Sequence, residues 1–144
     1  MKRQFCLDHL INNRLVTCLF LTLILVVPSH AATIRVSSVS AANSVGSPGD
    51  IILITPGTYS TSLRPRTSGT SGNPITYRGD GGAVTIQGTS QPGINLDQRN
   101  YIVVDNFRLI ELNDAFVALT SGAHHNTIQM MLFNIFNNQI LSGI

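Results

Sequence analysis

Two adjacent histidines, His124 and His125, are the first candidates for chemistry in this chain of 144 residues. Neutral imidazoles bind transition metals, and a histidine can also transfer protons near neutral pH. A metal site normally recruits further ligands, for which the fold would have to bring Asp97, Asp105 or Asp114 close. No third histidine follows position 31. We therefore interpret the histidine pair as a solvated turn and not as a metal site.

The arginines are the next candidates, because a guanidinium group can bind an anionic sugar. Arg64 and Arg66 flank Pro65, but charged side chains in a loop are usually solvated, and we interpret these two in that way. Met130 and Met131 are interpreted as core packing. No dense D-x-D-x-D-G calcium loop, G-x-S-x-G elbow, P-loop or dinucleotide motif is present. We predict no catalytic, cofactor-binding or metal-binding residue in this chain.

The first 31 residues have the features of a secretory signal peptide. A positively charged start precedes the apolar run LVTCLFLTLILVV at 15–27, which is shorter than the ~20 residues of a membrane span. Pro28 ends the run, and the small residues Ser29 and Ala31 stand at positions −3 and −1 of a cut after Ala31. We predict a signal peptide at 1–31, a domain at 32–144, and a secreted or periplasmic protein. An uncleaved anchor is the alternative.

Removal of this segment changes the composition of the chain. Cys6 and Cys18 are lost with it, so neither a disulfide nor a thiolate metal site can form in residues 32–144. Lys2 is the only lysine. The remaining six arginines and six acids balance to zero, so the charge gives no evidence for a nucleic-acid or membrane partner.

The mature segment is predicted to be all-β. Clusters of Gly, Pro, Asn and Asp separate short apolar runs that favour strands. The stretch 38–45 is the only plausible short helix. The expected strands are IILI (51–54), ITYR (75–78), VTIQ (84–87), INL (94–96), YIVV (101–104), FRLI (107–110), FVAL (116–119) and TIQMMLF (127–133).

A weak internal repeat distinguishes a solenoid from a sandwich. Placing Asn100 on Asn126 gives an offset of 126 − 100 = 26, and the runs at 94–96 and 116–117 are separated by about 22. Periods in the twenties favour one coil of a solenoid, with coils stacked at ~4.8 Å and like residues above one another. We expect the two asparagines at equivalent turns, with their amides bonding to the next coil. The offset of 26 pairs Ile102 with Ile128, Val104 with Met130, Phe107 with Phe133, and Leu109 with Ile135.

The order of segments resembles right-handed parallel β-helix proteins of the pectate-lyase-like group. It is most similar to the N-terminal coils of the polysaccharide lyase family that contains chondroitinase B and alginate lyases. The resemblance covers about 34–138, and Asn106 stands where that family more often has glycine. The segments that carry it are GDIILITPGTY (49–59), SGTSGNPITY (68–77), VTIQG (84–88), YIVVDNFRL (101–109) and NTIQMMLFN (126–134).

The resemblance implies a right-handed parallel β-helix, closed at its start by a helix or extra strand, and an anionic polysaccharide as partner. Enzymes of this family cleave uronic-acid polymers by β-elimination, often with calcium and with a lysine or arginine base. The family's domains have many more coils, and its catalytic residues come from later ones. We therefore expect an N-terminal piece of a polyuronate lyase-like protein that is inactive alone. The alternatives are a non-enzymatic surface or adhesion module that binds glycans or proteins, and a remnant without activity.

Overall fold

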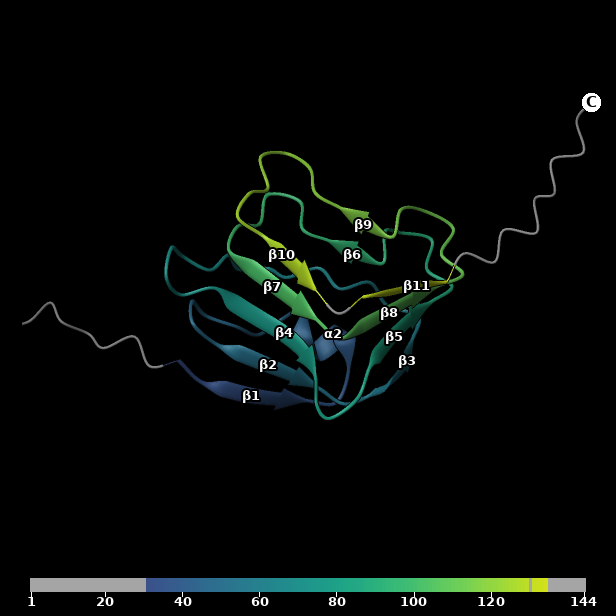
Figure 1. The fold of residues 1–144 in the computed structure, drawn as a ribbon, viewed down its shortest axis with the longest axis horizontal. Helices are drawn as coiled ribbons and strands as arrows, with labels where there is room; N and C mark the ends of the chain where they lie inside the picture. The colour runs from purple at the N-terminus through teal and green to yellow at the C-terminus, as the bar shows by residue number, and fades with distance from the viewer. Residues whose placement is uncertain (1–30, 130, 135–144) are drawn as a thin grey trace, which may run out of the picture.

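The computed structural model describes residues 31–129 and 131–134, and nearly all of its regular structure is β (Figure 1). The predicted signal peptide, apart from Ala31, lies outside the described residues. No helix in the described part is long and apolar enough to cross a membrane. The elements are β1 (Thr33–Val36), α2 (Val39–Ala42), β2 (Ile51–Ile54), β3 (Gly57–Tyr59), β4 (Ile75–Gly79), β5 (Val84–Gln87), β6 (Ile94–Asn95), β7 (Ile102–Asp105), β8 (Phe107–Ile110), β9 (Val117–Ala118), β10 (Thr127–Gln129) and β11 (Leu132–Asn134).

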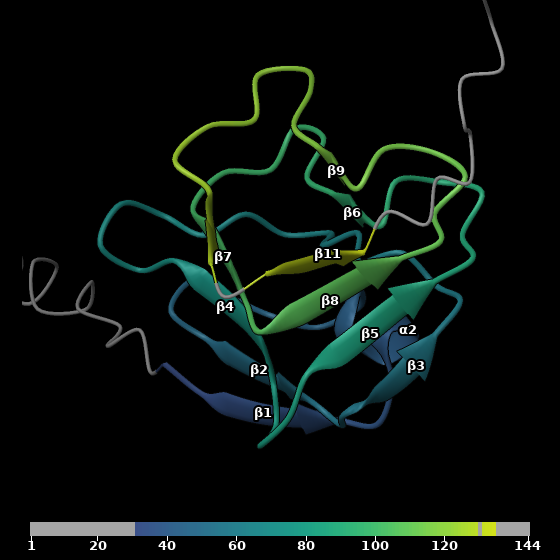
Figure 2. The same cartoon turned by 45° about the vertical axis from the view of Figure 1, so that its right-hand side comes forward.

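The strands form a parallel β-solenoid of about three coils. Successive coils contribute strands in turn to a sheet of order β1-β2-β4-β7-β10, a sheet of order β11-β8-β5-β3, and the pair β6-β9. All eight strand pairs between the described elements are parallel. Figure 2 shows the sheets as the walls of one coiled ribbon. The prediction of an all-β parallel β-helix is confirmed, and the sandwich alternative is wrong.

The apolar runs formed strands where they were expected, with one exception. The run at 127–133 was predicted as a single strand, but it is divided between β10 in the first sheet and β11 in the second. A continuous apolar run does not reveal a corner between two buried faces. The strands β1 and β3 were not predicted from the sequence.

The core is a set of ladders in which each coil places an apolar residue over the one below. Alternate residues of each strand point inward, so the outward face of the first sheet carries a different, more polar ladder. Burial, and next the charge of Asp50, raise the pKa of the inward Tyr77 to about 12, and its hydroxyl donates to the Val45 carbonyl at 3.2 Å. The central inward ladder of the first sheet is Ile34, Ile52, Tyr77, Val104 and Ile128.

The single turn of helix α2 contributes to this core. Ser38 caps it, accepting from the Ala41 amide at 3.1 Å, and Val39 and Ala42 are fully buried. The expected helix at 38–45 is therefore present but shorter, at 39–42.

The predicted register between the last two coils is wrong by two residues. Thr127 pairs with Val103 and Leu132 with Arg108, so the offset is 127 − 103 = 24 and not 26. The offset between β6 and β9 is 117 − 94 = 23, close to the predicted 22. Because side chains alternate with period two, a slip of two residues leaves every side chain on its predicted face. The sequence therefore predicted the inward positions correctly and their partners incorrectly.

The corrected pairs are Val104 with Ile128 and Leu109 with Phe133. Both replace pairs that the offset of 26 had predicted. Met130 and Ile135, the other predicted partners, lie outside the described residues.

The two asparagines are not equivalent, although both bond between coils as expected. Asn100 lies below His124, and its side-chain oxygen accepts from the His124 amide at 2.9 Å. Asn126 reaches back: its side-chain oxygen accepts from the Ile102 amide at 2.9 Å and its NH₂ donates to the Arg99 carbonyl at 2.7 Å. Neither of them has a positive φ. Asn106 does, at 60°, which explains how it replaces a glycine there.

Replacing Asn126 with alanine should destabilise the protein by about 1–3 kcal/mol, because the change leaves a partly buried amide and carbonyl without partners. Chemical denaturation followed by circular dichroism measures the loss. Asn73→Ala is the control: this side chain is exposed, and the change should cost less than about 0.5 kcal/mol. Equal effects of the two changes would show that the inter-coil bonds do not stabilise the stack.

Candidate functional site

A pocket of about 420 Å³ lies between the loop that follows β3 and the turn that joins β6 to β7. Its walls come from two coils and from Asn43, which caps the C-terminal end of α2. Pro65 is buried and Asn95 is half-buried. The lining is polar and includes three of the six arginines of residues 32–144: Asn43, Arg64, Pro65, Arg66, Asn95, Asp97, Gln98 and Arg99.

None of the three arginines, Arg64, Arg66 and Arg99, forms a salt bridge within the described part of the chain. Arg64 and Arg66 are exposed, as predicted, and no guanidinium hydrogen bond of either is found among the described residues. Arg99 donates from Nε to the Pro65 carbonyl at 3.0 Å and from Nη1 to the Gln98 carbonyl at 3.5 Å. A guanidinium carries five N–H donors, so Arg99 is oriented by neutral partners and keeps donors for a ligand.

Asp97 is the only acid in the lining of this pocket. Hydrogen bonds from Ser121 and Thr120, and then the charges of Arg99 and Arg64, hold the pKa of its carboxyl below the usual value. The Thr120 hydroxyl donates to Asp97 Oδ1 at 2.8 Å. Three arginines and one aspartate give the pocket a formal charge of 3 − 1 = +2, whereas residues 32–144 as a whole are neutral.

Such a pocket suits an anion with neighbouring hydroxyl groups. Guanidinium groups bind planar carboxylates with two parallel hydrogen bonds. The exposed side-chain amide of Gln98 has no partner within the described residues and can bond to hydroxyls. In contrast, Asn43 is already used: its NH₂ donates to the Ser62 carbonyl at 2.9 Å and its oxygen accepts from the Arg64 amide at 2.7 Å. Asn43 therefore positions the loop that carries Arg64.

The sequence singled out Arg64 and Arg66 but not Arg99, which is 99 − 64 = 35 residues from Arg64. That separation exceeds every coil offset seen between paired strands, so periodicity could not connect the two residues. The loop after β3 runs parallel to β6 of the next coil, with Leu63 bridged to Ile94, and this brings the two arginines together.

Replacing Asp97 with asparagine should raise the affinity of this pocket for anions by about two- to fivefold, because it removes the opposing charge. The side-chain oxygen that accepts from Thr120 is kept. Calorimetric titration with an acidic oligosaccharide measures the change. Asp114→Asn, an exposed acid outside the lining, should leave the affinity unchanged. If Asp97→Asn instead lowered the affinity for the oligosaccharide, this carboxylate would accept hydrogen bonds from the ligand.

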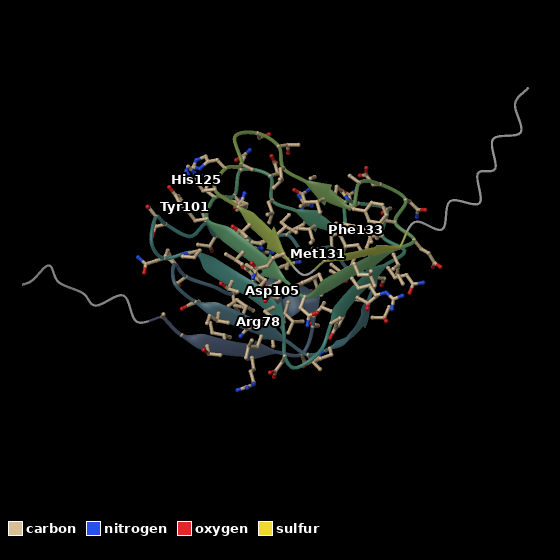
Figure 3. All side chains as sticks on the ribbon, viewed as in Figure 1. Arg78, Tyr101, Asp105, His125, Met131 and Phe133 are labelled. Atoms are coloured by element: carbon tan, nitrogen blue, oxygen red, sulfur yellow. The ribbon has the colours of Figure 1, made fainter. Side chains whose placement is uncertain are left out.

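The histidine pair is exposed, as predicted for a solvated turn. The ring of His125 stacks on Tyr101 of the coil below, with centroids 4.9 Å apart, and Figure 3 shows the two side by side. The two Nδ1 atoms of His124 and His125 lie 2.6 Å apart. No group of three or more potential metal ligands is found in the part of the chain that the structure describes. The stacking on Tyr101 gives His125 a packing role at the turn.

The remaining candidates lie apart from one another. Asp105 ends β7 on the outward face of the first sheet, beside Arg78 of the coil below (Figure 3), and its Oδ1 is buried without a hydrogen-bond partner among the described residues. Asp114 is exposed in the loop before β9, where it accepts from the Ala115 amide at 2.7 Å. Met131 packs against the core as predicted, and Met130 lies outside the described residues.

Comparison with known proteins gives a similarity to a solved structure. No family model matches this chain, and no curated protein matches it. The crystal structure of an alginate lyase from Paenibacillus sp. str. FPU-7 is similar at 26% sequence identity, with a TM-score of 0.47, over 69% of this chain. The match covers 44% of the enzyme, so this chain spans less than half of that protein's length.

Proposed function

We propose that this chain forms the N-terminal coils of a secreted, polyuronate lyase-like β-helix domain, and that its arginine pocket binds an acidic polysaccharide. The observation that supports the proposal best is the gathering of Arg64, Arg66 and Arg99 around one pocket, where none of them forms a salt bridge with a described residue. The predicted leader peptide is the support for export, and the segments quoted above are the support for the lyase-like family.

The pocket favours a uronic acid over a neutral sugar for a physical reason. A carboxylate between guanidinium groups gains charge-assisted hydrogen bonds, each stronger than a neutral one, without the need to displace an existing ion pair. A neutral sugar would leave a local charge of +2 unpaired. The volume of about 420 Å³ lies within the range of small-ligand sites and suits a short stretch of a polymer.

Binding and cleavage are separate questions for these residues. Elimination needs a neutralised carboxylate and a base beside the carbon-bound proton. The arginines of the pocket can neutralise a carboxylate. For the base, however, the chain has no lysine after Lys2, and no arginine occupies a motif of the family's catalytic residues. Calcium, if the whole protein uses it, would belong with coils beyond these. We expect no unsaturated uronic ends when this chain is incubated with alginate, pectate or chondroitin sulfate, as measured by the ultraviolet absorbance of the unsaturated product.

The binding proposal is tested with matched oligosaccharides. The chain is titrated calorimetrically with oligomers of mannuronate, guluronate and galacturonate and with neutral cello-oligosaccharides of the same length. We expect binding of the acidic oligomers alone, weakening as the salt concentration rises because the contacts are ionic. Equal affinity for neutral and acidic oligomers, or no binding of either, would contradict the proposal.

A further inference from the structure

The buried acid Asp50 has backbone partners but no cationic partner among the described residues. It is 5% exposed, its Oδ1 accepts from the Ala32 amide at 2.8 Å, and its Oδ2 accepts from the Ser47 amide at 2.7 Å. The one ion pair found among the described residues, Arg35 with Asp80, is elsewhere. A buried carboxylate without an opposite charge is costly, even when amides donate to it. Asp50 is therefore a site where a positive charge would stabilise the fold.

This carboxylate contacts the residue that follows the predicted cleavage site. Ala32, whose nitrogen donates to Asp50, is the first residue after a cut that follows Ala31. We propose that removal of the leader creates the missing cation: the new α-ammonium group of Ala32 forms an ion pair with Asp50 and fastens the first strand to the stack. Hydrolysis of the Ala31–Ala32 bond by a peptidase consumes one water. It leaves a carboxylate on Ala31, and the released amine of Ala32 takes up a proton.

The contacts of the residues that follow place the Ala32 nitrogen beside Asp50. The Ala32 carbonyl accepts from the Ile51 amide at 2.8 Å, and β1 begins at the next residue and pairs with β2 along its whole length. Among the described strands, β1 is the edge strand of its sheet (Figure 1) and pairs with β2 alone. An ion pair at its start would stabilise a strand that pairs with only one other described strand.

The pair depends on the position of the cut. A cut one residue earlier leaves an uncharged amide opposite Asp50, and a cut one residue later removes the Ala32 nitrogen altogether. Asp50 therefore distinguishes a chain that begins at Ala32 from chains processed at the neighbouring bonds.

The composition allows a selective test. No lysine follows Lys2, so the processed chain has a single primary amine, its α-amino group. The full chain is expressed in an exporting bacterial host, the intact mass identifies the first residue, and the protein is then treated with an amine-directed acylating reagent at neutral pH. Only the unprotonated amine reacts, so each unit by which the ion pair raises the pKa of the amine slows acylation about tenfold. We expect Ala32 as the first residue and slow acylation.

Two variants separate the ion pair from general protection. Asp50→Asn should accelerate acylation at least several-fold, whereas Asp80→Asn, which removes the exposed partner of Arg35, should not. If Asp50→Asn does not fold, a variant with one alanine inserted between Ala31 and Ala32 keeps Asp50 and moves the amine one residue outward, and it should react quickly. A first residue other than Ala32, or equal acylation rates in the unchanged protein, Asp50→Asn and the insertion variant, would overturn the proposal. None of these outcomes depends on glycan binding.

Discussion

Replacing Arg64, Arg66 and Arg99 together with glutamine should abolish detectable binding of acidic oligosaccharides. Each guanidinium contributes charge-assisted hydrogen bonds that glutamine cannot make, so each single change should weaken binding about three- to tenfold. The triple change reverses the local charge from +2 to 3 − 1 − 3 = −1. Calorimetric titration of the single and triple variants with one acidic oligomer measures the losses.

The matched control is Arg78→Gln, because Arg78 is exposed on the outward face of the first sheet and does not line the pocket. It should leave the affinity unchanged, and all variants should keep the circular dichroism spectrum of the unchanged chain. If Arg78→Gln weakened binding as much as the pocket variants do, the acidic glycan would lie on the sheet face and not in the pocket.

Replacing Val104 with aspartate should prevent cooperative folding. Val104 is fully buried in the central inward ladder, between Tyr77 below and Ile128 above. An unpaired carboxylate there costs several kcal/mol, which is comparable to the ~5–15 kcal/mol total stability of a typical domain. Thermal unfolding monitored by circular dichroism should show no cooperative transition for this variant.

The adjacent position provides the control. Val103→Asp makes the same substitution one residue away on β7, where the side chain points outward between Thr76 and Thr127. This variant should fold and lose at most about 1–2 kcal/mol. Similar behaviour of the two variants would show that β7 does not have one buried and one outward face, which the solenoid requires.

The sequence predicted which side of the sheet each strand residue faces, but not which residue of the neighbouring strand it pairs with. Alternation of apolar and polar residues is local, so the strands at 51–54, 84–87 and 107–110 were predicted with their observed bounds. Register depends on the number of residues in each corner and loop, which varies: paired strands are offset by 25 between β2 and β4, 27 between β4 and β7, and 24 between β7 and β10. Matching Asn100 to Asn126 assumed a constant repeat, and the identical residues proved to lie two positions apart.

The sequence by itself determined the all-β class, the repetitive coil and the inward positions, because these follow from residue type and periodicity along the chain. Only the tertiary structure decided which residues meet. It brought Arg99 to Arg64 across 35 residues and Ala32 to Asp50 across 18. Both contacts depend on how a loop or a strand end packs against the neighbouring coil, and no local sequence pattern specifies that packing.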